Sequence, residues 1–250
     1  MRAVHVADSI TPGPAVRALD RIGQDRVRVA SVSAQRSQPA RGAISIVPVG
    51  LRVEGRRVVV VGAGRIAARK AAAYVAQGAL VSVIAPEHGP EMASVEVDVR
   101  IHRRFETSDL NRVWLAVAAT GVPVVDAAVF DEAERRRIWC NAADDPDHCS
   151  MILPAVARAG DITIAVSTGG RSPAVASWLR RRIEALLDDE TLVIAEACAR
   201  VRTQARAVGL ATEVPGWSRV LDHEAHQLVS DGRASELERR LLDEVFGERP

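Results

Sequence analysis

A short glycine-rich segment between a predicted strand and a predicted helix constrains the fold of this chain most. The segment 57–61 (RVVVV) is an apolar run of β-branched residues, which is typical of a buried parallel strand. It leads directly into the hexapeptide 62–67 (GAGRIA), and the alanine- and arginine-rich sequence that follows has helical character. A G-x-G-x-x-A pattern at such a strand-to-helix turn is the arrangement that binds dinucleotides.

Each small residue of this turn has a separate task. Gly62 makes the tight turn, Gly64 lets a pyrophosphate approach the backbone, and Ala67 lets the helix pack closely on the strand. The free N–H groups at the start of the helix would then hold the phosphates. The alternative is a glycine-rich turn that binds no ligand.

The composition limits the classes of protein that this chain can belong to. Its 250 residues are 48% hydrophobic, which suffices for one large domain or two modest ones. The net charge of +1 gives no general attraction to nucleic acids or membranes, and the 3% aromatic content disfavours base stacking. The apolar runs are too short to span a membrane. The three cysteines form no C-x-x-C motif, which favours free thiols in a reducing cytoplasm.

The order of predicted elements indicates an α/β fold with a Rossmann-like, doubly wound parallel sheet. Residues 1–43 show little periodicity and are expected to be a poorly ordered extension. A dinucleotide-binding domain is expected at 44–150, with strands at 57–61, 80–85, 97–103, 113–119 and 138–142. Residues 151–171 then predict a β-hairpin that leaves the parallel sheet, and residues 172–250 a helical domain.

Ligands of such a sheet bind outside the carboxyl ends of its strands. Three segments should meet there, namely the Gly62 turn, Thr120-Gly121 and the stretch 141–146. We expect NAD rather than NADP, because the second strand ends in Ala85-Pro86-Glu87, with no arginine to hold a 2′-phosphate.

Asp144 is the candidate for the chemistry, because it lies just past the fifth predicted strand. A carboxylate there can act as a general base where partial burial raises its pKa. The alternative is that Asp144 or Asp145 only caps the turn before Pro146. The sequence lacks the Tyr-x-x-x-Lys, G-x-S-x-G and H-E-x-x-H motifs of other enzymes. His223 and His226 lack a third ligand nearby, so no metal site is predicted.

Four segments, taken in order, resemble the siroheme synthase N-terminal module, the family of precorrin-2 dehydrogenase and sirohydrochlorin ferrochelatase. They are VVVVGAGRIAARKAA, LVSVIAPE, WLAVAAT and NAADDPDHCSMILPAVARAGDITIAVSTGGRSPAVASWLRRRIEALL. The most specific feature is the order N-x-x-D, I-L-P-A and I-A-V-S-T-G-G-x-S-P in the last segment. The resemblance covers about residues 47–187.

This resemblance implies NAD-dependent oxidation of precorrin-2 to sirohydrochlorin, with Fe²⁺ as a further substrate where the protein is also a chelatase. It implies that Asp144 serves both activities. The expected NAD contacts are Gly62, Gly64, Arg65, Ile66, Ala67, Pro86, Glu87 and Thr120. The expected tetrapyrrole contacts are Asn141, Thr168, Gly169 and Arg171.

The resemblance also implies partners. A homodimer formed through residues 151–171 is expected, and a separate uroporphyrinogen-III methyltransferase would supply precorrin-2, since this chain shows no methyltransferase domain before Pro250. The chain departs from the family at 121–125 (GVPVV), where an acidic stretch and an Asn are common. It departs again at Ser150-Met151, where relatives often have Asp-Phe. Both departures bear on substrate fit and chelatase activity. A non-catalytic NAD(H)-sensing module and a chelatase without dehydrogenase activity stay open as alternatives.

Overall fold

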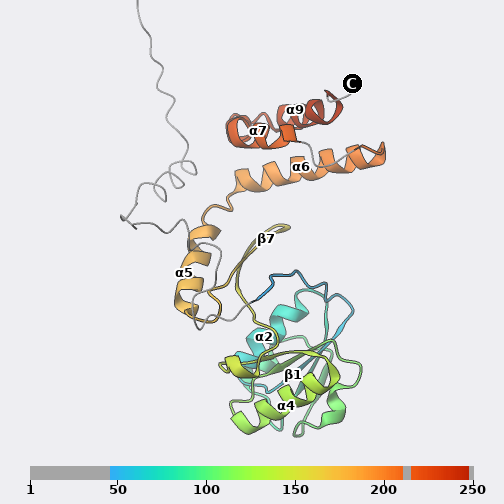
Figure 1. Cartoon of the computed structure of the whole chain (residues 1–250), viewed down its shortest axis with the longest axis vertical. Coiled ribbons are helices and arrows are strands. Elements are labelled where there is room, and N and C mark those ends of the chain that lie inside the picture. Colours follow the sequence, from blue (N-terminus) through green and yellow to red (C-terminus); the bar gives the residue numbers. More distant parts are fainter. Residues whose placement is uncertain (1–45, 211–214, 248–250) are drawn as a thin grey trace, which may run out of the picture. The chain divides into compact units, whose positions relative to one another are not determined.

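The computed structural model describes residues 46–210 and 215–247, which fall into two compact units (Figure 1). The first unit contains residues 46–154 and 167–172, and the second contains 155–166, 173–210 and 215–247. The extension predicted at 1–43 lies outside the described residues. No helix within the two described ranges has both the length and the apolar character needed to cross a membrane.

The first unit is built on a sheet of five parallel strands in the order β3-β2-β1-β4-β5. They are β1 (Arg57–Val61), β2 (Leu80–Ile84), β3 (Val99–Ile101), β4 (Leu115–Ala118) and β5 (Trp139–Ala142). β1 pairs with both β2 and β4, so that Val59 lies opposite Ser82 on one side and Ala116 on the other. The strand order reverses between β1 and β4, which places the switch point at their carboxyl ends. The predicted Rossmann-like fold is confirmed.

Helices cover both faces of this sheet, with α2 and α4 on opposite sides of β1 (Figure 1). Val58 and Val60 pack in the core beneath α2 and α3, whereas Val59 and Val61 pack in the core beneath η1 and α4. The continuous valine run of β1 follows from this burial on both faces. The covering elements are α2 (Arg65–Val75), α3 (Pro90–Ala93), η1 (Thr107–Leu110) and α4 (Pro123–Arg136).

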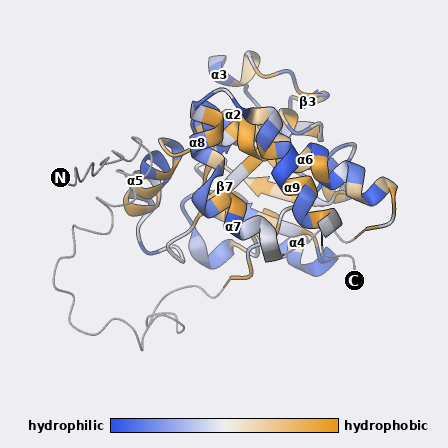
Figure 2. Cartoon of the chain, turned by 90° about the horizontal axis from the view of Figure 1, so that it is seen from above, coloured by the Kyte–Doolittle hydropathy of each residue, from blue (hydrophilic) through white to orange (hydrophobic). Residues whose placement is uncertain are grey.

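The second unit contains an antiparallel hairpin and five helices in its described residues. The hairpin strands are β6 (Ala155–Ala159) and β7 (Ile162–Val166), and α5 (Pro173–Glu184) packs on both. The other helices are α6 (Asp189–Ala207), α7 (Pro215–His223), α8 (Ala225–Ser230) and α9 (Ala234–Gly247). Hydrophobic and hydrophilic residues alternate along α6 and α9 in Figure 2. The apolar sides of the two helices belong to one core, to which α6 contributes Val201 and α9 contributes Leu237. The predicted hairpin and helical region are confirmed.

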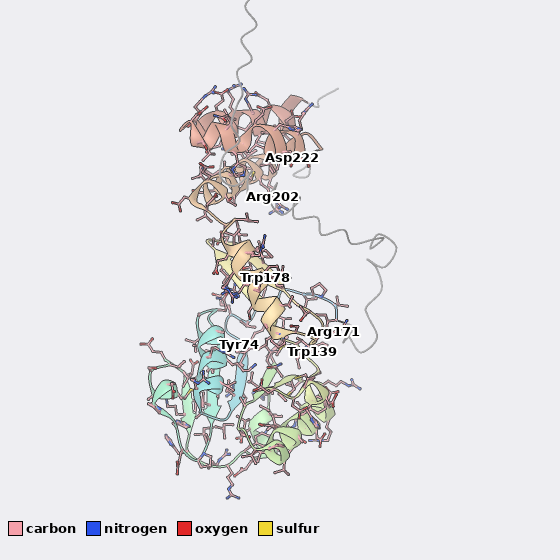
Figure 3. All side chains as sticks on the ribbon, turned by 90° about the vertical axis from the view of Figure 1, so that its left-hand side faces the viewer. Tyr74, Trp139, Arg171, Trp178, Arg202 and Asp222 are labelled. Atoms are coloured by element: carbon pink, nitrogen blue, oxygen red, sulfur yellow. The ribbon has the colours of Figure 1, made fainter. Side chains whose placement is uncertain are left out.

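Tyr74, the only tyrosine of the chain, is buried on α2 beside the sheet (Figure 3). Its hydroxyl group has no hydrogen-bond partner among the described residues. Burial raises the pKa of Tyr74 to about 12, and the neighbouring Cys140 adds to the increase. A buried hydroxyl without a partner costs about 1–3 kcal/mol of stability, so the ring of Tyr74 stabilises this core and its hydroxyl does not.

We expect Tyr74→Phe to raise the free energy of unfolding by about 1 kcal/mol, because it removes an unpaired buried hydroxyl and keeps the ring. Thermal and denaturant unfolding would measure this change. In the native wild-type protein the phenolate absorbance should appear only near pH 12, whereas in the denatured chain it should appear near pH ~10. A Tyr74→Phe variant that is less stable than wild type would show that the hydroxyl is hydrogen-bonded after all. Phenolate absorbance of the native protein at the same pH as in the denatured chain would also contradict this description of Tyr74.

Candidate functional site

The turn after β1 passes so close to the end of β4 that only glycine fits at its first position. Gly62 has a φ of +109°, and a Cβ added there would lie 2.2 Å from the carbonyl oxygen of Ala119. The N–H of Gly62 donates a hydrogen bond to the carbonyl of Ile84 at 2.8 Å. Gly62 therefore joins the carboxyl ends of β1, β2 and β4 at the switch point.

The start of α2 is open where a phosphate would approach. Gly64 is the N-cap residue in an extended conformation, and no side chain caps the helix there. A Cβ added at Gly64 would meet no atom within 4 Å. Ala67 is fully buried, so its small side chain permits close packing, whereas Arg65 is exposed. The uncapped N–H groups of this first turn and the open space at Gly64 fit the pyrophosphate of a dinucleotide.

The loop after β2 folds back onto the glycine turn. The N–H of Gly89 donates to the carbonyl of Ala63 at 3.1 Å. Pro86 and Glu87 precede this contact and are both exposed, directly after the buried Ala85. Pro86 and Glu87, the expected cofactor contacts on this loop, are thus accessible, and the loop is hydrogen-bonded to the glycine turn.

The loop after β4 is held by a buried carboxylate. Asp126, on α4, is 6% exposed and accepts hydrogen bonds from the N–H of Thr120 at 3.1 Å and from its hydroxyl at 2.8 Å. The Thr120 hydroxyl oxygen in turn accepts from the N–H of Val122 at 3.0 Å. Asp126 was not among the residues predicted from the sequence. An acidic residue in the first turn of a helix was the available signal.

The fifth strand brings a buried amide to the sheet face beneath α2. Asn141 lies on β5 opposite Val117 and is 6% exposed. Its Nδ2 donates to the carbonyl of Met151 at 2.9 Å, and its Oδ1 accepts from the Nζ of Lys70 at 2.6 Å. Lys70 is the only lysine in the chain, and no role was predicted for it from the sequence.

Asp144 lies in the turn that follows β5, and its side chain is exposed. Asp144 is therefore not a buried carboxylate in this structure. Its φ of +60° is left-handed, a conformation in which Asp and Asn are enriched among the residues other than glycine. A charged side chain held in such a conformation outside regular structure is a frequent feature of functional sites.

A sulfur atom closes the loop that carries Asp144. The Sγ of Cys149 lies 3.2 Å from the N–H and the carbonyl oxygen of Ala142 and 3.2 Å from the carbonyl oxygen of Asp145. Burial raises the pKa of the Cys149 thiol, so this sulfur stays protonated near neutral pH and acts as a structural contact. Within the loop, η2 (Pro146–His148) places the Nδ1 of His148 2.7 Å from a carboxylate oxygen of Asp145.

The loop 167–172 belongs to the same compact unit as the sheet. The Thr168 hydroxyl accepts from the N–H of Ser172 and donates to its carbonyl, both at 3.1 Å. Gly169 follows with a φ of +60°, and Arg171 is exposed (Figure 3). These bonds hold the backbone of the loop and leave the Arg171 guanidinium accessible.

Sheet topology therefore brings Gly62, Thr120 and the Asp144 turn to the carboxyl ends of the neighbouring strands β1, β4 and β5. By contrast, His223 and His226 lie in the second unit, at the end of α7 and in α8. Residues 46–210 and 215–247 contain no group of three or more His, Cys, Asp or Glu side chains placed to hold a metal ion.

Comparison with known proteins gives consistent matches. Residues 49–155 match a family model described as putative NAD(P)-binding, and residues 160–186 match one described as sirohaem biosynthesis protein central. The chain is 34% identical over 179 residues to siroheme synthase 3 of Aeromonas hydrophila, which covers 70% of this chain and 38% of that relative. It is 32% identical over 205 residues to siroheme synthase 1 of Serratia proteamaculans, which covers 79% and 43% respectively.

The chain thus spans about two fifths of the length of these curated relatives. It is also similar to a solved structure named SirC, precorrin-2 dehydrogenase, with a TM-score of 0.63 and 22% sequence identity. That similarity covers 78% of this chain and 98% of the solved one, and it bears on the fold.

Two glycine substitutions should separate the fold from cofactor binding. Gly64→Ala places its methyl group in open space at an ordinary φ, so we expect wild-type thermal stability. The methyl group would occupy the path of the pyrophosphate and weaken NAD⁺ binding about tenfold or more, or about 1.4 kcal/mol.

Gly62→Ala, the matched variant, would overlap the Ala119 carbonyl and should destabilise the fold by about 3 kcal/mol or more. Calorimetric titration with NAD⁺ and thermal unfolding would measure both variants. Undiminished NAD⁺ affinity in a folded Gly64→Ala variant would contradict a pyrophosphate position at this turn.

Proposed function

Because the chain belongs to the family of the siroheme synthase N-terminal module, we propose that it oxidises precorrin-2 to sirohydrochlorin with NAD⁺. The observation that carries this proposal is the open, uncapped start of α2 at Gly64, on the same sheet edge as the turn of Asp144. One edge thus offers a position for a dinucleotide and a carboxylate that can accept a proton.

The residues proposed to hold the cofactor come from the three loops at this edge. NAD⁺, when bound, supplies the acceptor for a hydride. The backbone of the turn would bind its pyrophosphate, and the loops after β2 and β4 would flank the rest of the dinucleotide. These residues are Gly62, Gly64, Arg65, Ile66, Ala67, Pro86, Glu87 and Thr120. We propose NAD over NADP because Ala85-Pro86-Glu87 offers no cation to a 2′-phosphate.

The oxidation removes two hydrogens from the tetrapyrrole, one as a hydride and one as a proton. The two electrons leave with the hydride, and Asp144 receives the proton as general base. Asn141, Thr168, Gly169 and Arg171 are proposed to contact the tetrapyrrole. Its carboxylates suit the exposed guanidinium of Arg171, because arginine binds carboxylates through paired N–H donors.

A second reaction at Asp144 is proposed for the same product. Insertion of Fe²⁺, as a substrate, into sirohydrochlorin releases two pyrrole N–H protons, and Asp144 would accept them in turn. We further propose a homodimer formed through residues 151–171, a cytoplasmic location, and precorrin-2 made by a uroporphyrinogen-III methyltransferase.

The test is anaerobic absorbance of the purified protein with enzymatically made precorrin-2, with and without NAD⁺, and then with Fe²⁺. A sirohydrochlorin spectrum that appears only with NAD⁺ would support the dehydrogenase, and a later metal-dependent change would add the chelatase. NAD⁺ binding without either reaction would favour an NAD(H)-sensing module. Metal insertion without NAD⁺ binding would favour a chelatase alone.

Substitution of Asp144 by Asn should separate catalysis from folding. Asn tolerates the left-handed backbone of residue 144 and removes the proton acceptor, so NAD⁺ affinity and thermal stability should stay at wild-type values. We expect kcat for precorrin-2 oxidation to fall on the order of 10²- to 10⁴-fold. Asp147→Asn, an exposed aspartate in the same loop, is the matched control. Wild-type turnover by Asp144→Asn would remove Asp144 from the reaction.

A further inference from the structure

Lys70 is a half-buried cation beside the proposed reaction centre. Its side chain leaves α2 and ends at the buried amide of Asn141, where the Nζ···Oδ1 distance is 2.6 Å. The residues one turn away on either side, Ala67 and Tyr74, are buried in the core of the sheet. Lys70 therefore joins the helix of the glycine turn to the strand that leads to Asp144.

The ammonium group of Lys70 and the Met151 carbonyl together fix which way the Asn141 amide points. The Nδ2 of Asn141 donates to the Met151 carbonyl and lies 3.5 Å from the Cys149 sulfur. A reversed amide would direct an N–H donor at the ammonium group and an oxygen at a carbonyl, so both contacts would become repulsive. Met151 and Cys149 belong to the segment that closes the Asp144 loop, so Lys70 acts on that loop through Asn141.

No carboxylate among the described residues lies within ion-pair distance of Lys70, although Asp144 and Cys149 are close enough to act on its charge. Burial lowers the pKa of Lys70, the neighbouring Arg69 lowers it further, and Cys149 and Asp144 partly oppose both. A half-buried charge without an ion pair is unfavourable for stability. A neutral side chain would fill this space equally well, and ionisable groups with such perturbed surroundings are typical of functional sites.

We propose that Lys70 is a positioning residue of the reaction at Asp144. Its ammonium group fixes the Asn141 amide and, through Met151 and Cys149, the loop in which Asp144 accepts a proton. This inference rests on the proposed precorrin-2 oxidation and adds to it a residue for which no role was predicted from the sequence.

The test compares two neutralisations one residue apart on α2. Lys70→Gln keeps a donor for Asn141 Oδ1 but loses the charge that orients the amide. We expect kcat to fall on the order of 10- to 100-fold, while the Kd for NAD⁺ and the thermal midpoint stay near wild type. Arg69→Gln, the matched control at an exposed position, should keep wild-type kcat at neutral pH. Lys70→Met, which buries no polar group, replaces Lys70→Gln if the glutamine variant fails to fold.

The pH dependence of kcat is a second measurement, and a purely structural lysine would not affect it. Because the pKa of Lys70 is lowered, its ammonium group loses its proton at a lower pH than that of an ordinary lysine. If kcat depends on this charge, kcat should therefore decline as the pH rises, before the pH at which an ordinary lysine titrates. Lys70→Arg stays charged, so it should retain activity and lose this decline. Arg69→Gln removes a cation that lowers the pKa of Lys70, so the decline should move to higher pH.

The outcomes distinguish this inference from the proposed function. Wild-type protein that fails to oxidise precorrin-2 would overturn both. An active wild type, with Lys70→Gln or Lys70→Met variants that keep its kcat and pH profile, would overturn the role of Lys70 alone. A reduced kcat in Lys70→Gln or Lys70→Met, together with wild-type kcat in Lys70→Arg, would support the role of Lys70.

Discussion

The contact between Gly62 and the end of β4 is the constraint on which the rest of the sheet edge depends. The Ala119 carbonyl occupies the space that any side chain at residue 62 would need. The N–H of Ala119 donates to the carbonyl of Val61 at 2.8 Å, and Gly62 donates to Ile84 at the same distance. Three strand ends are thereby fixed by backbone contacts alone. The start of α2 then lies over the switch point, whatever side chains the loops carry.

Most ion pairs among the described residues join an arginine to a carboxylate. Glu132, for example, lies between Arg135 and Arg136, which lower its pKa to about 2. Where both side chains are exposed, such pairs contribute little to stability. Lys70 differs from these arginines, because it is a half-buried lysine whose partner is the neutral side chain of Asn141. It also lies beside Asn141, one of the few buried polar side chains described. Lys70 and Asn141 thus place a charge without an ion pair and a buried amide together on one side of β5.

Local sequence determined the elements that could be predicted. The strand predicted at 57–61 has those bounds in the structure, because four consecutive valines fit only a strand buried on both faces. The helix predicted after the glycine turn and the hairpin predicted within 151–171 were also located correctly, since glycines end the first and turn the second. The short elements α3 and η1 were missed, because a single turn shows no periodicity.

The contacts that organise the site could not be predicted in the same way. Lys70 and Asn141 are 71 positions apart, and their contact depends on the register of β5 and on the side of the sheet that α2 covers. The exposure of Asp144 depends on how the chain leaves β5, which the sequence pattern N-x-x-D does not specify. Residue types at the strand ends were therefore predictable, whereas their surroundings required the tertiary structure. The roles of these residues stay predictions.

The departure from the family at Ser150 acquires a physical explanation from these surroundings. The Ser150 hydroxyl accepts a hydrogen bond from the N–H of Cys140 at 2.9 Å, and the N–H groups of Ser150 and Met151 donate to the Cys140 carbonyl. An aspartate at this position could accept the same bond through a carboxylate oxygen. Serine thus keeps the contact that holds this segment against β5, and it carries one negative charge fewer than aspartate would. The departure therefore changes the charge of this segment more than its backbone contacts.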